Sequence, residues 1–259
     1  MSKNIFQQYG AYYDLLYRDK DYAGEVDYIV SLLHRSSPRA HQILEFGSGT
    51  GRHGRLLAQR GFDVLGVEGS EAMVAEAKRN SNGFHPLTKG RFDCRRGDIR
   101  SVVLDRQFDS VLALFHVVSY QTTNHGLLRT FSNAARHLRS GGVFLFDVWH
   151  GPAVLTERPA TRVKRVEDEN TMLTRIAEPK LDTNAAIVTV HYTMISQAKA
   201  DSQINTFTEE HRMRYLFPTE IDLFAQQTGF EVEHSEEFLT GKPPAEGTWG
   251  VAYLLRKKA

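Results

Sequence analysis

The sequence is poor in cysteine, in long apolar runs and in charge of one sign. Its single cysteine, Cys94, excludes an intrachain disulfide and any metal site built from several cysteines. No run approaches the roughly 18 apolar residues of a membrane-spanning helix, and the first residues form no apolar signal segment. Basic and acidic residues number 32 and 31 and are interleaved, so no basic patch for nucleic acid is predicted. We therefore expect a cytoplasmic protein that binds neither nucleic acid nor a membrane.

What the sequence does contain is a regular alternation of short apolar strands with helix-periodic segments between residues 42 and 148. The 259 residues are 41% hydrophobic, which suits one large domain or one domain with an insert. Strands are expected at residues 42–46, 62–68, 91–96, 108–115 and 143–148, and helices at 52–60, 71–80 and 124–138. Strands that alternate with helices predict a parallel sheet covered on both faces.

The alternation of strands with helices ends after residue 150. Residues 161–215 have few helical periods and several strand-like runs, with turn signals at Glu178-Pro179 and at Asp182-Thr183-Asn184. This pattern predicts an antiparallel insert. A helix at 219–228 and two strands at 230–237 and 248–256 follow it, and helical pieces at 5–33 precede the first strand.

The loop after the first strand carries two overlapping glycine patterns. Residues 49–54, Gly-Thr-Gly-Arg-His-Gly, fit the dinucleotide pattern G-x-G-x-x-G, while Glu45 is followed by the alternate glycines Gly47, Gly49 and Gly51. Glycines let a ligand approach the backbone N–H groups near the N-terminus of the next helix. Dinucleotides and S-adenosylmethionine (SAM) both bind to loops of this kind, so the pattern alone leaves both open.

Charge distinguishes the two ligands. A carboxylate at Glu45 is unfavourable beside a pyrophosphate but compatible with the cationic sulfonium of SAM. Glu68, which ends the second strand, can accept hydrogen bonds from ribose hydroxyls in either class. Asp98, after the third strand, can accept one from an adenine amino group while Ile99 packs on the ring. These positions favour SAM.

This ordered set resembles the class I SAM-dependent methyltransferases. The resemblance covers residues 42–148 and resumes near residue 219. It implies a doubly wound, mostly parallel seven-stranded α/β sheet that ends in a reversed strand pair, with an antiparallel β insert after the fifth strand. The core residues it implies for the cofactor are Glu45, Gly47, Ser48, Gly49, Gly51, Glu68, Gly69, Met73, Asp98, Ile99 and Phe115.

The aromatic N-terminal stretch at residues 12–22 resembles the arm of the sugar N-methyltransferases of antibiotic pathways, which dimethylate nucleotide-linked aminodeoxysugars. The shared pattern is Tyr13-Asp14 followed by Lys20-Asp21-Tyr22. The resemblance implies that Tyr13 and Tyr17 border the methionine part of SAM and that Tyr22 faces the acceptor. It divides the chain into a helical lid arm at 1–36, a SAM-binding core at 37–150 and 216–259, and an insert at 151–215 bordering the acceptor pocket.

The sequence departs from that family near the acceptor. The family places a histidine shortly after the fourth strand, where this chain has Tyr120, with His116 on the same face if the segment is helical. The candidate catalytic residues are therefore Tyr120, His116 and His150. By the same resemblance, Trp149 belongs to the family's aromatic pair. The run His211-Arg212-Met213-Arg214-Tyr215 resembles segments of many bacterial small-molecule methyltransferases, which implies that His211 and Arg214 border the acceptor pocket.

We thus predict methyl transfer from SAM to a nitrogen or oxygen of a small polar acceptor, with a sugar or nucleotide-linked aminosugar favoured. One alternative is an NAD(P)-dependent oxidoreductase. The Tyr-x-x-x-Lys pair of short-chain dehydrogenases is absent, however, because the residue four positions after Tyr120 is Asn124 and the residue four positions after Tyr192 is Ser196. Another is a noncatalytic SAM-binding assembly protein. No acidic cluster after the fourth strand predicts a metal, and exposed strands of the insert could pair two subunits as a homodimer.

Overall fold

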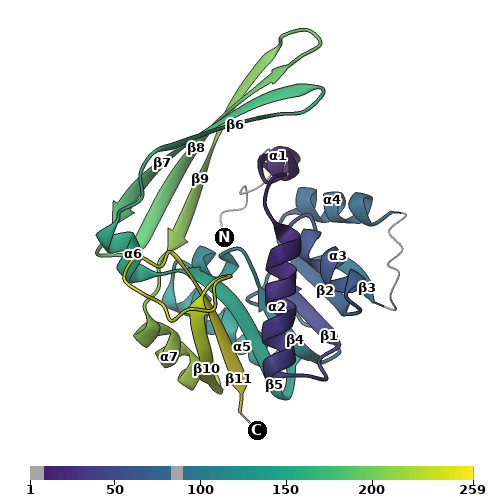
Figure 1. Cartoon of the computed structure of the whole chain (residues 1–259), viewed down its shortest axis with the longest axis vertical. Coiled ribbons are helices and arrows are strands. Elements are labelled where there is room, and N and C mark those ends of the chain that lie inside the picture. The colour runs from purple at the N-terminus through teal and green to yellow at the C-terminus, as the bar shows by residue number, and fades with distance from the viewer. Residues whose placement is uncertain (1–8, 83–89, 259) are drawn as a thin grey trace.

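The core of the molecule is a seven-stranded, mostly parallel sheet (Figure 1). The computed structural model describes residues 9–82 and 90–258. The strand order is β10-β11-β5-β4-β1-β2-β3, and the antiparallel pairs of this sheet are β10 with β11 and β11 with β5. The strands are β1 (Gln42–Phe46), β2 (Asp63–Glu68), β3 (Arg91–Arg96), β4 (Phe108–Ala113), β5 (Leu138–Trp149), β10 (Phe230–Glu237) and β11 (Gly250–Lys257). The predicted doubly wound sheet with a reversed final pair is confirmed.

Helices pack against this sheet through apolar faces. Helices α2 (Tyr22–Ser36) and α3 (Arg52–Gln59) share a buried cluster with β1, β2, β4 and β5, in which Ile29 and Leu57 have no exposed surface. Helices α5 (Asn124–His137) and α7 (Pro218–Gln227) contribute Phe131 and Phe224 to a second cluster on the sheet. Helix α4 (Glu71–Ser81) packs over β3. Burial of these faces on folding fixes where the strands end, and therefore where the loops of the site lie.

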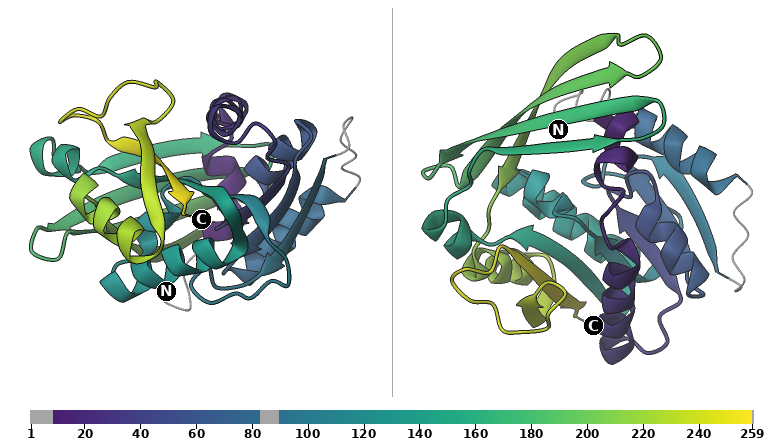
Figure 2. Two further views of the ribbon diagram at one scale, coloured as in Figure 1. Left: turned by 90° about the horizontal axis from the view of Figure 1, so that it is seen from below. Right: turned by 45° about the horizontal axis from the view of Figure 1, so that its top comes forward.

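A second sheet of four antiparallel strands is inserted between β5 and α7. It consists of β6 (Arg162–Glu167), β7 (Thr171–Asp182), β8 (Ile187–Ala198) and β9 (Ile204–Arg214), and the chain enters it through α6 (Gly151–Thr156). Figures 1 and 2 show this sheet extending over one end of the core, with helix α1 (Tyr9–Leu16) between the two. Tyr9 and Leu16 of α1 are buried against Leu173 and Met194 of the inserted sheet. We call α1 together with β6–β9 the roof.

Residues 9–36 form two helices that pack differently: α2 belongs to the core, and α1 lies against the inserted sheet. The division of the chain into lid arm, core and insert stays a prediction. The structure corrects one detail of the sequence prediction. The turn expected at Glu178-Pro179 is wrong: both residues lie inside β7 and pair with His191 and Val190 of β8. β6 pairs with β7 only as far as Ala177, so one side of β7 is a free edge at Pro179. Because proline has no backbone N–H to donate, it is tolerated at such an edge.

Among residues 9–82 and 90–258, no helix combines the length and the apolar character that crossing a membrane requires.

Candidate active site

A cavity of about 940 Å³ lies between the carboxyl ends of the parallel strands and the roof. Three separate parts of the chain line it: the glycine loop with the ends of β2, β3 and β4, helix α1 with the turn after it, and the inner face of β8 and β9. Ligand sites of open parallel sheets form at this edge. The predicted site residues that line the cavity are Tyr13, Tyr17, Tyr22, Gly47, Ser48, Gly49, Glu68, Gly69, Met73, Asp98, Ile99, Phe115, His116, Tyr120, Trp149 and His211.

The glycine loop is shaped by backbone conformations that other residues adopt poorly. Gly47 has φ +68°, and a β carbon there would lie 2.5 Å from Cγ2 of Val117. Gly49 has φ +53°. The atom nearest to a β carbon added at Gly49 would be the sulfur of Met73, 3.9 Å away, so this glycine leaves open space for a ligand. The loop is therefore a cradle whose shape depends on glycine.

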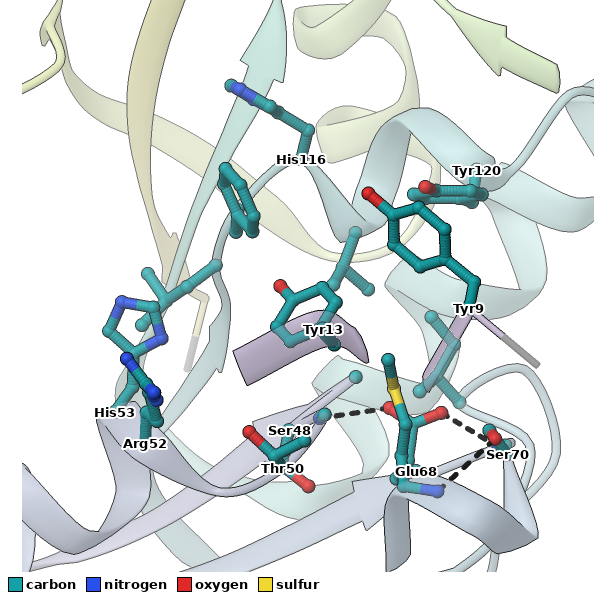
Figure 3. A pocket seen from close by; sticks show the side chains of 18 of the residues that line it. Tyr9, Tyr13, Ser48, Thr50, Arg52, His53, Glu68, Ser70, His116 and Tyr120 are labelled. Carbon is teal, nitrogen blue, oxygen red and sulfur yellow. Dashed lines mark hydrogen bonds between the residues drawn. The ribbon is translucent and has the colours of Figure 1, made fainter. Parts of the chain in front are cut away.

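Glu68 closes the cradle from β2. Its carboxylate accepts hydrogen bonds from the backbone N–H groups of Gly49 (3.0 Å) and Ser70 (2.8 Å), as Figure 3 shows. Burial raises the pKa of Glu68, and these backbone donors partly counteract the effect. A pyrophosphate in this loop would compete with Glu68 for the Gly49 N–H and would face its negative charge. The cradle thus fits the uncharged adenosine and cationic sulfonium of SAM better than it fits a dinucleotide.

The structure places Glu45 behind the loop rather than in the cavity. It is 2% exposed, and a β carbon at Gly54 would lie 2.9 Å from its Oε2. Burial, together with the negative charge of Glu68, raises the pKa of Glu45 to about 8. The carboxyl group is therefore largely neutral at pH 7, and the charge that we expected from Glu45 at the ligand comes instead from Glu68. Gly51, at φ +77° immediately before α3, also lies outside the cavity lining.

Asp98 lies at another point of the cavity wall, where it is bound by Arg100. The guanidinium donates to both carboxylate oxygens, at 2.6 and 2.9 Å, and this hydrogen bonding lowers the pKa of Asp98. Ile99, only 4% exposed, packs into the main core behind it. Asp98 is thus an ionised acceptor beside an apolar residue at the end of β3.

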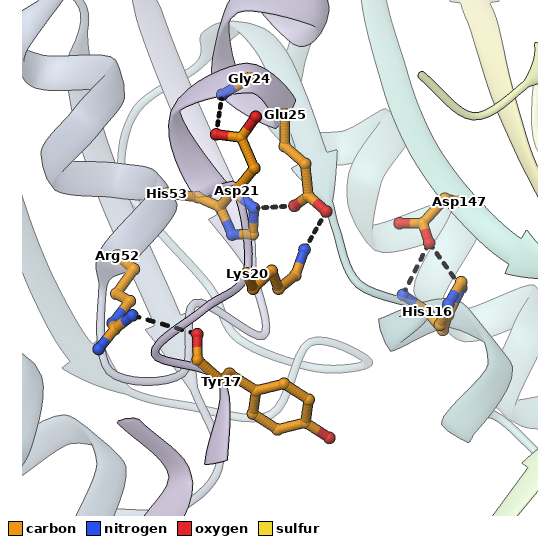
Figure 4. A network of polar contacts seen from close by, with 9 residues as sticks. All are labelled: Tyr17, Lys20, Asp21, Gly24, Glu25, Arg52, His53, His116 and Asp147. Carbon is orange, nitrogen blue, oxygen red and sulfur yellow. Dashed lines mark hydrogen bonds and ion pairs between the residues drawn. The ribbon is translucent and has the colours of Figure 1, made fainter. Parts of the chain in front are cut away.

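Helix α1 and the turn after it are tied to the glycine loop and the start of α3. Asp14 accepts from the Thr50 hydroxyl (2.8 Å) and lies 3.2 Å from Nε of Arg52, which also donates to the carbonyl oxygen of Tyr17. Figure 4 shows a second connection, in which Glu25 pairs with Lys20 and with His53 (2.8 Å). Arg52 and His53 occupy the variable positions of the glycine pattern, and nothing in the sequence singled them out.

Tyr120 and His211, which the sequence proposed separately, are brought together. The Tyr120 hydroxyl lies 2.8 Å from Nδ1 of His211, and Nε2 of His211 lies 3.3 Å from Glu209. Burial raises the pKa of Tyr120 well above its usual value. Glu209 also accepts from the backbone N–H of Tyr9 (3.0 Å). A polar chain therefore runs from the cavity wall into the roof.

His116 is directed elsewhere. It precedes the short helical turn Val117–Tyr120 with φ +64°, so it does not share a helical face with Tyr120. Its Nδ1 lies 2.6 Å from the buried carboxylate of Asp147 on β5, and Figure 4 shows the imidazole turned toward that carboxylate. Burial alone would raise the pKa of Asp147, but the nearby His116 lowers it.

Two further predicted residues, besides Glu45 and Gly51, lie outside the cavity lining. His150 is 4% exposed, its Nδ1 lies 3.1 Å from the carbonyl oxygen of Thr248, and burial lowers its pKa. Arg214 donates to Glu220 (2.5 Å) and Asn124 (2.6 Å), so it fastens β9 to α5 and α7. The cavity residues that the sequence reasoning did not select are Tyr9, Thr50, Arg52, His53, Ser70, Glu71, Ala72, Arg96, Gly97, Arg100, Leu114, Val117, Tyr192 and Met213.

The fold and this cradle define a SAM-dependent methyltransferase, and the oxidoreductase and assembly-protein alternatives are not favoured. Residues 43–142 match the family described as the methyltransferase domain. A dTDP-3-amino-3,4,6-trideoxy-alpha-D-glucopyranose N,N-dimethyltransferase of Streptomyces venezuelae is 28% identical over 239 residues, covering 91% of this chain and 93% of the relative. A dTDP-3-amino-3,6-dideoxy-alpha-D-glucopyranose N,N-dimethyltransferase of Streptomyces fradiae is 28% identical over 91% of this chain and 87% of its own.

Solved structures match the fold over nearly the whole chain. The sugar N-methyltransferase KedS8 from Streptoalloteichus matches with a TM-score of 0.79 at 24% identity, over 95% of this chain and 93% of that chain. DesVI of Streptomyces venezuelae matches with a TM-score of 0.78 at 24% identity, over 97% and 98%. At this identity the structures establish the fold.

Proposed function

We propose that the enzyme transfers methyl groups to the amino nitrogen of a nucleotide-linked aminodeoxysugar. The single observation that carries this proposal is the chain Tyr120–His211–Glu209 at the wall of a cavity that also contains the SAM cradle. The full-length relatives named as N,N-dimethyltransferases of dTDP-linked aminosugars support the choice of acceptor.

An amine attacks with a free lone pair, so a proton must leave the ammonium form of the acceptor before methylation or the ammonium product after it, and the Tyr120 chain provides a route for this proton. Tyr120 keeps its own proton because burial raises its pKa, and it donates that proton to Nδ1 of His211. Its oxygen lone pairs are then available to accept from an N–H of the acceptor. When that proton moves to Tyr120, the phenolic proton passes to His211, and the carboxylate of Glu209 stabilises the resulting imidazolium.

The residues of the core are proposed to hold the cofactor. SAM supplies an activated methyl group when it is bound. Glu68 accepts from the ribose hydroxyls, while Asp98 and Ile99 receive the adenine. Tyr13, Tyr17 and Phe115 border the methionine part. Because the donor is already activated, the chain contributes mostly alignment and exclusion of water, and Trp149 and Tyr22 contribute to the wall around the acceptor.

The proposal is tested by incubating the enzyme with SAM and matched acceptors. The acceptors are a dTDP-linked aminodeoxysugar, its analogue with hydroxyl in place of the amine, and glycine, since some relatives that match about half of the chain are glycine/sarcosine N-methyltransferases. We expect mono- and dimethylated aminosugar by mass spectrometry and no product from the other two. Methylation of only the hydroxyl analogue or of glycine would contradict the proposal.

A further inference from the structure

The inner face of the inserted sheet places two positive charges directly opposite each other. Lys164 on β6 and Arg175 on β7 are cross-strand partners. They lie on the same face as Val166 and Leu173, which pack against α1. Like charges in this arrangement destabilise a sheet, so such a pair needs a compensating group.

No carboxylate provides that compensation in the described part of the chain. Neither Lys164 nor Arg175 forms an ion pair among residues 9–82 and 90–258. The sequences of residues 1–8 and 83–89 contain no aspartate or glutamate. Lys164 donates to the carbonyl oxygen of Leu16 (2.6 Å) at the end of α1, which offers only the partial charge of a helix terminus.

Arg175 is surrounded by tyrosines instead. Its Nη1 donates to the hydroxyl oxygens of Tyr9 and Tyr17, both at 3.1 Å, and its Nε is buried without a hydrogen-bond partner among the described residues. The guanidinium carbon lies 5.2 Å from the ring centre of Tyr192. Burial raises the pKa of Tyr9 far above its usual value, so this phenol stays neutral and does not balance the charge. The guanidinium is partly buried, and no carboxylate of the described residues pairs with it, although charges removed from water are normally paired.

The tyrosines of this cluster separate the two cations from the cavity. Tyr9, Tyr17 and Tyr192 all line it, whereas Lys164 and Arg175 are not among the lining residues. The hydroxyl groups of Tyr9 and Tyr17 accept from Arg175 and lie 3.2 Å from each other, within hydrogen-bond distance. The roof therefore places two positive charges behind a linked pair of tyrosine hydroxyls, an arrangement that favours an anion.

We propose that Lys164, Arg175, Tyr9 and Tyr17 form a binding site for the diphosphate group of the nucleotide-linked acceptor. This inference rests on the proposed function, because it names the part of that acceptor which the roof recognises. The diphosphate supplies the negative charge that the Lys164–Arg175 pair lacks. The aminosugar attached to it then extends along the cavity wall toward Tyr120.

The test compares Arg175→Gln and Lys164→Gln with Arg165→Gln, which removes the same charge from an exposed position on β6. Calorimetry measures the affinity of the full chain for thymidine diphosphate and for inorganic pyrophosphate with S-adenosylhomocysteine present, and for S-adenosylhomocysteine alone. We expect Arg175→Gln to bind thymidine diphosphate about 10- to 100-fold more weakly, with pyrophosphate weakened in parallel. Arg165→Gln and the affinity for S-adenosylhomocysteine should stay unchanged. Arg175→Lys should retain part of the affinity because it keeps the charge.

The other outcomes are equally informative. If Arg175→Gln weakens S-adenosylhomocysteine and leaves thymidine diphosphate unchanged, the anion is the cofactor's carboxylate and the inference is wrong. Unchanged affinity for both ligands in a variant with the wild-type melting temperature also overturns it. Failure of the proposed function looks different, since the wild type would then bind thymidine diphosphate through Arg175 yet methylate no aminosugar.

Discussion

The two walls of the cavity hold their charged groups differently. In the wall formed by the parallel sheet, Arg100 pairs with Asp98, whereas Glu68 forms no ion pair among the described residues. The roof contains Arg175 and Lys164, which lie behind tyrosines and have no carboxylate partner among the described residues. The carboxylate of Glu68 would suit a cationic sulfonium, and the two cations of the roof would suit an anionic group. Unpaired charges of opposite sign on two walls let one cavity orient two different ligands.

The walls also differ in how they are built. The core wall comes from strand ends and loops that follow one another along the chain, with the glycine loop directly preceding α3. The roof combines α1 with strands more than 140 residues later in the sequence, through bonds such as Tyr12 to Ser196 (3.0 Å). If the comparison holds, changes in the core wall should affect the cofactor, and changes in the roof should affect the acceptor.

The largest effect is expected from Gly47→Ala in the core wall. Alanine at φ +68° is strained, and its β carbon would overlap Val117. The backbone strain and the overlap with Val117 together should destabilise the fold or the loop by about 2–5 kcal/mol and abolish tight SAM binding. Thermal melting and calorimetry measure the two effects. Adding Val117→Ala should recover part of the stability, and wild-type SAM affinity in Gly47→Ala would show that the loop does not hold the cofactor.

Glu45→Gln tests the buried carboxyl behind the loop. Its pKa is about 8 in the folded chain, above the 4.5 of the unfolded chain, so the native state holds an extra proton between these values. The contribution of Glu45 to stability is therefore lost as pH rises from about 4.5 to 8. We expect the advantage of Glu45→Gln over the wild type to grow by up to about 1.4 kcal/mol per pH unit in this window. Denaturant titrations at several pH values measure it, and a pH-independent difference would mean that Glu45 is ionised in the fold.

Tyr120→Phe tests the contact between the core and the inserted sheet, where Tyr120 meets His211 of β9. Removing the hydroxyl breaks the proton route to His211, so kcat should fall about 100-fold, equivalent to about 2.7 kcal/mol, with SAM affinity unchanged. His211→Gln should give a similar loss. His116→Gln is the comparison and should lower kcat less, because the imidazole is turned toward Asp147. Steady-state kinetics decide among them, and full activity of Tyr120→Phe would remove it from the mechanism.

Glu68→Ala should have the smallest of these effects and should be confined to the cofactor. Loss of the carboxylate unpairs the Gly49 and Ser70 N–H groups and the ribose hydroxyls, which should weaken SAM binding by about 1–3 kcal/mol. Calorimetry measures the change. Glu231→Ala, an exposed glutamate on β10, serves as the charge-matched control. A loss of acceptor affinity without loss of SAM affinity would break the division between the walls.

Local sequence patterns predicted most of the core wall, but not the position of Glu45 or the part played by Arg52 and His53. Strand and helix alternation predicted the parallel sheet, and the glycine spacing placed Gly47, Gly49 and Glu68 at one edge of it. These signals work because short-range periodicity reports which faces are buried, and because parallel strands bring their carboxyl ends together. The predicted homodimer stays a prediction.

Only the tertiary structure decided the roof. The sequence suggested Tyr120 and His211 as separate candidates, and their 2.8 Å contact depends on how β9 returns over the core. In the core wall, too, the sequence predicted Glu45 beside the ligand, whereas the structure buries that side chain behind the loop, against α3. The pairing of Lys164 with Arg175 depends on strand register, and no sequence pattern reveals that two cations share a face without a carboxylate. Local burial is encoded in neighbouring residues, whereas charge compensation depends on which distant segments meet.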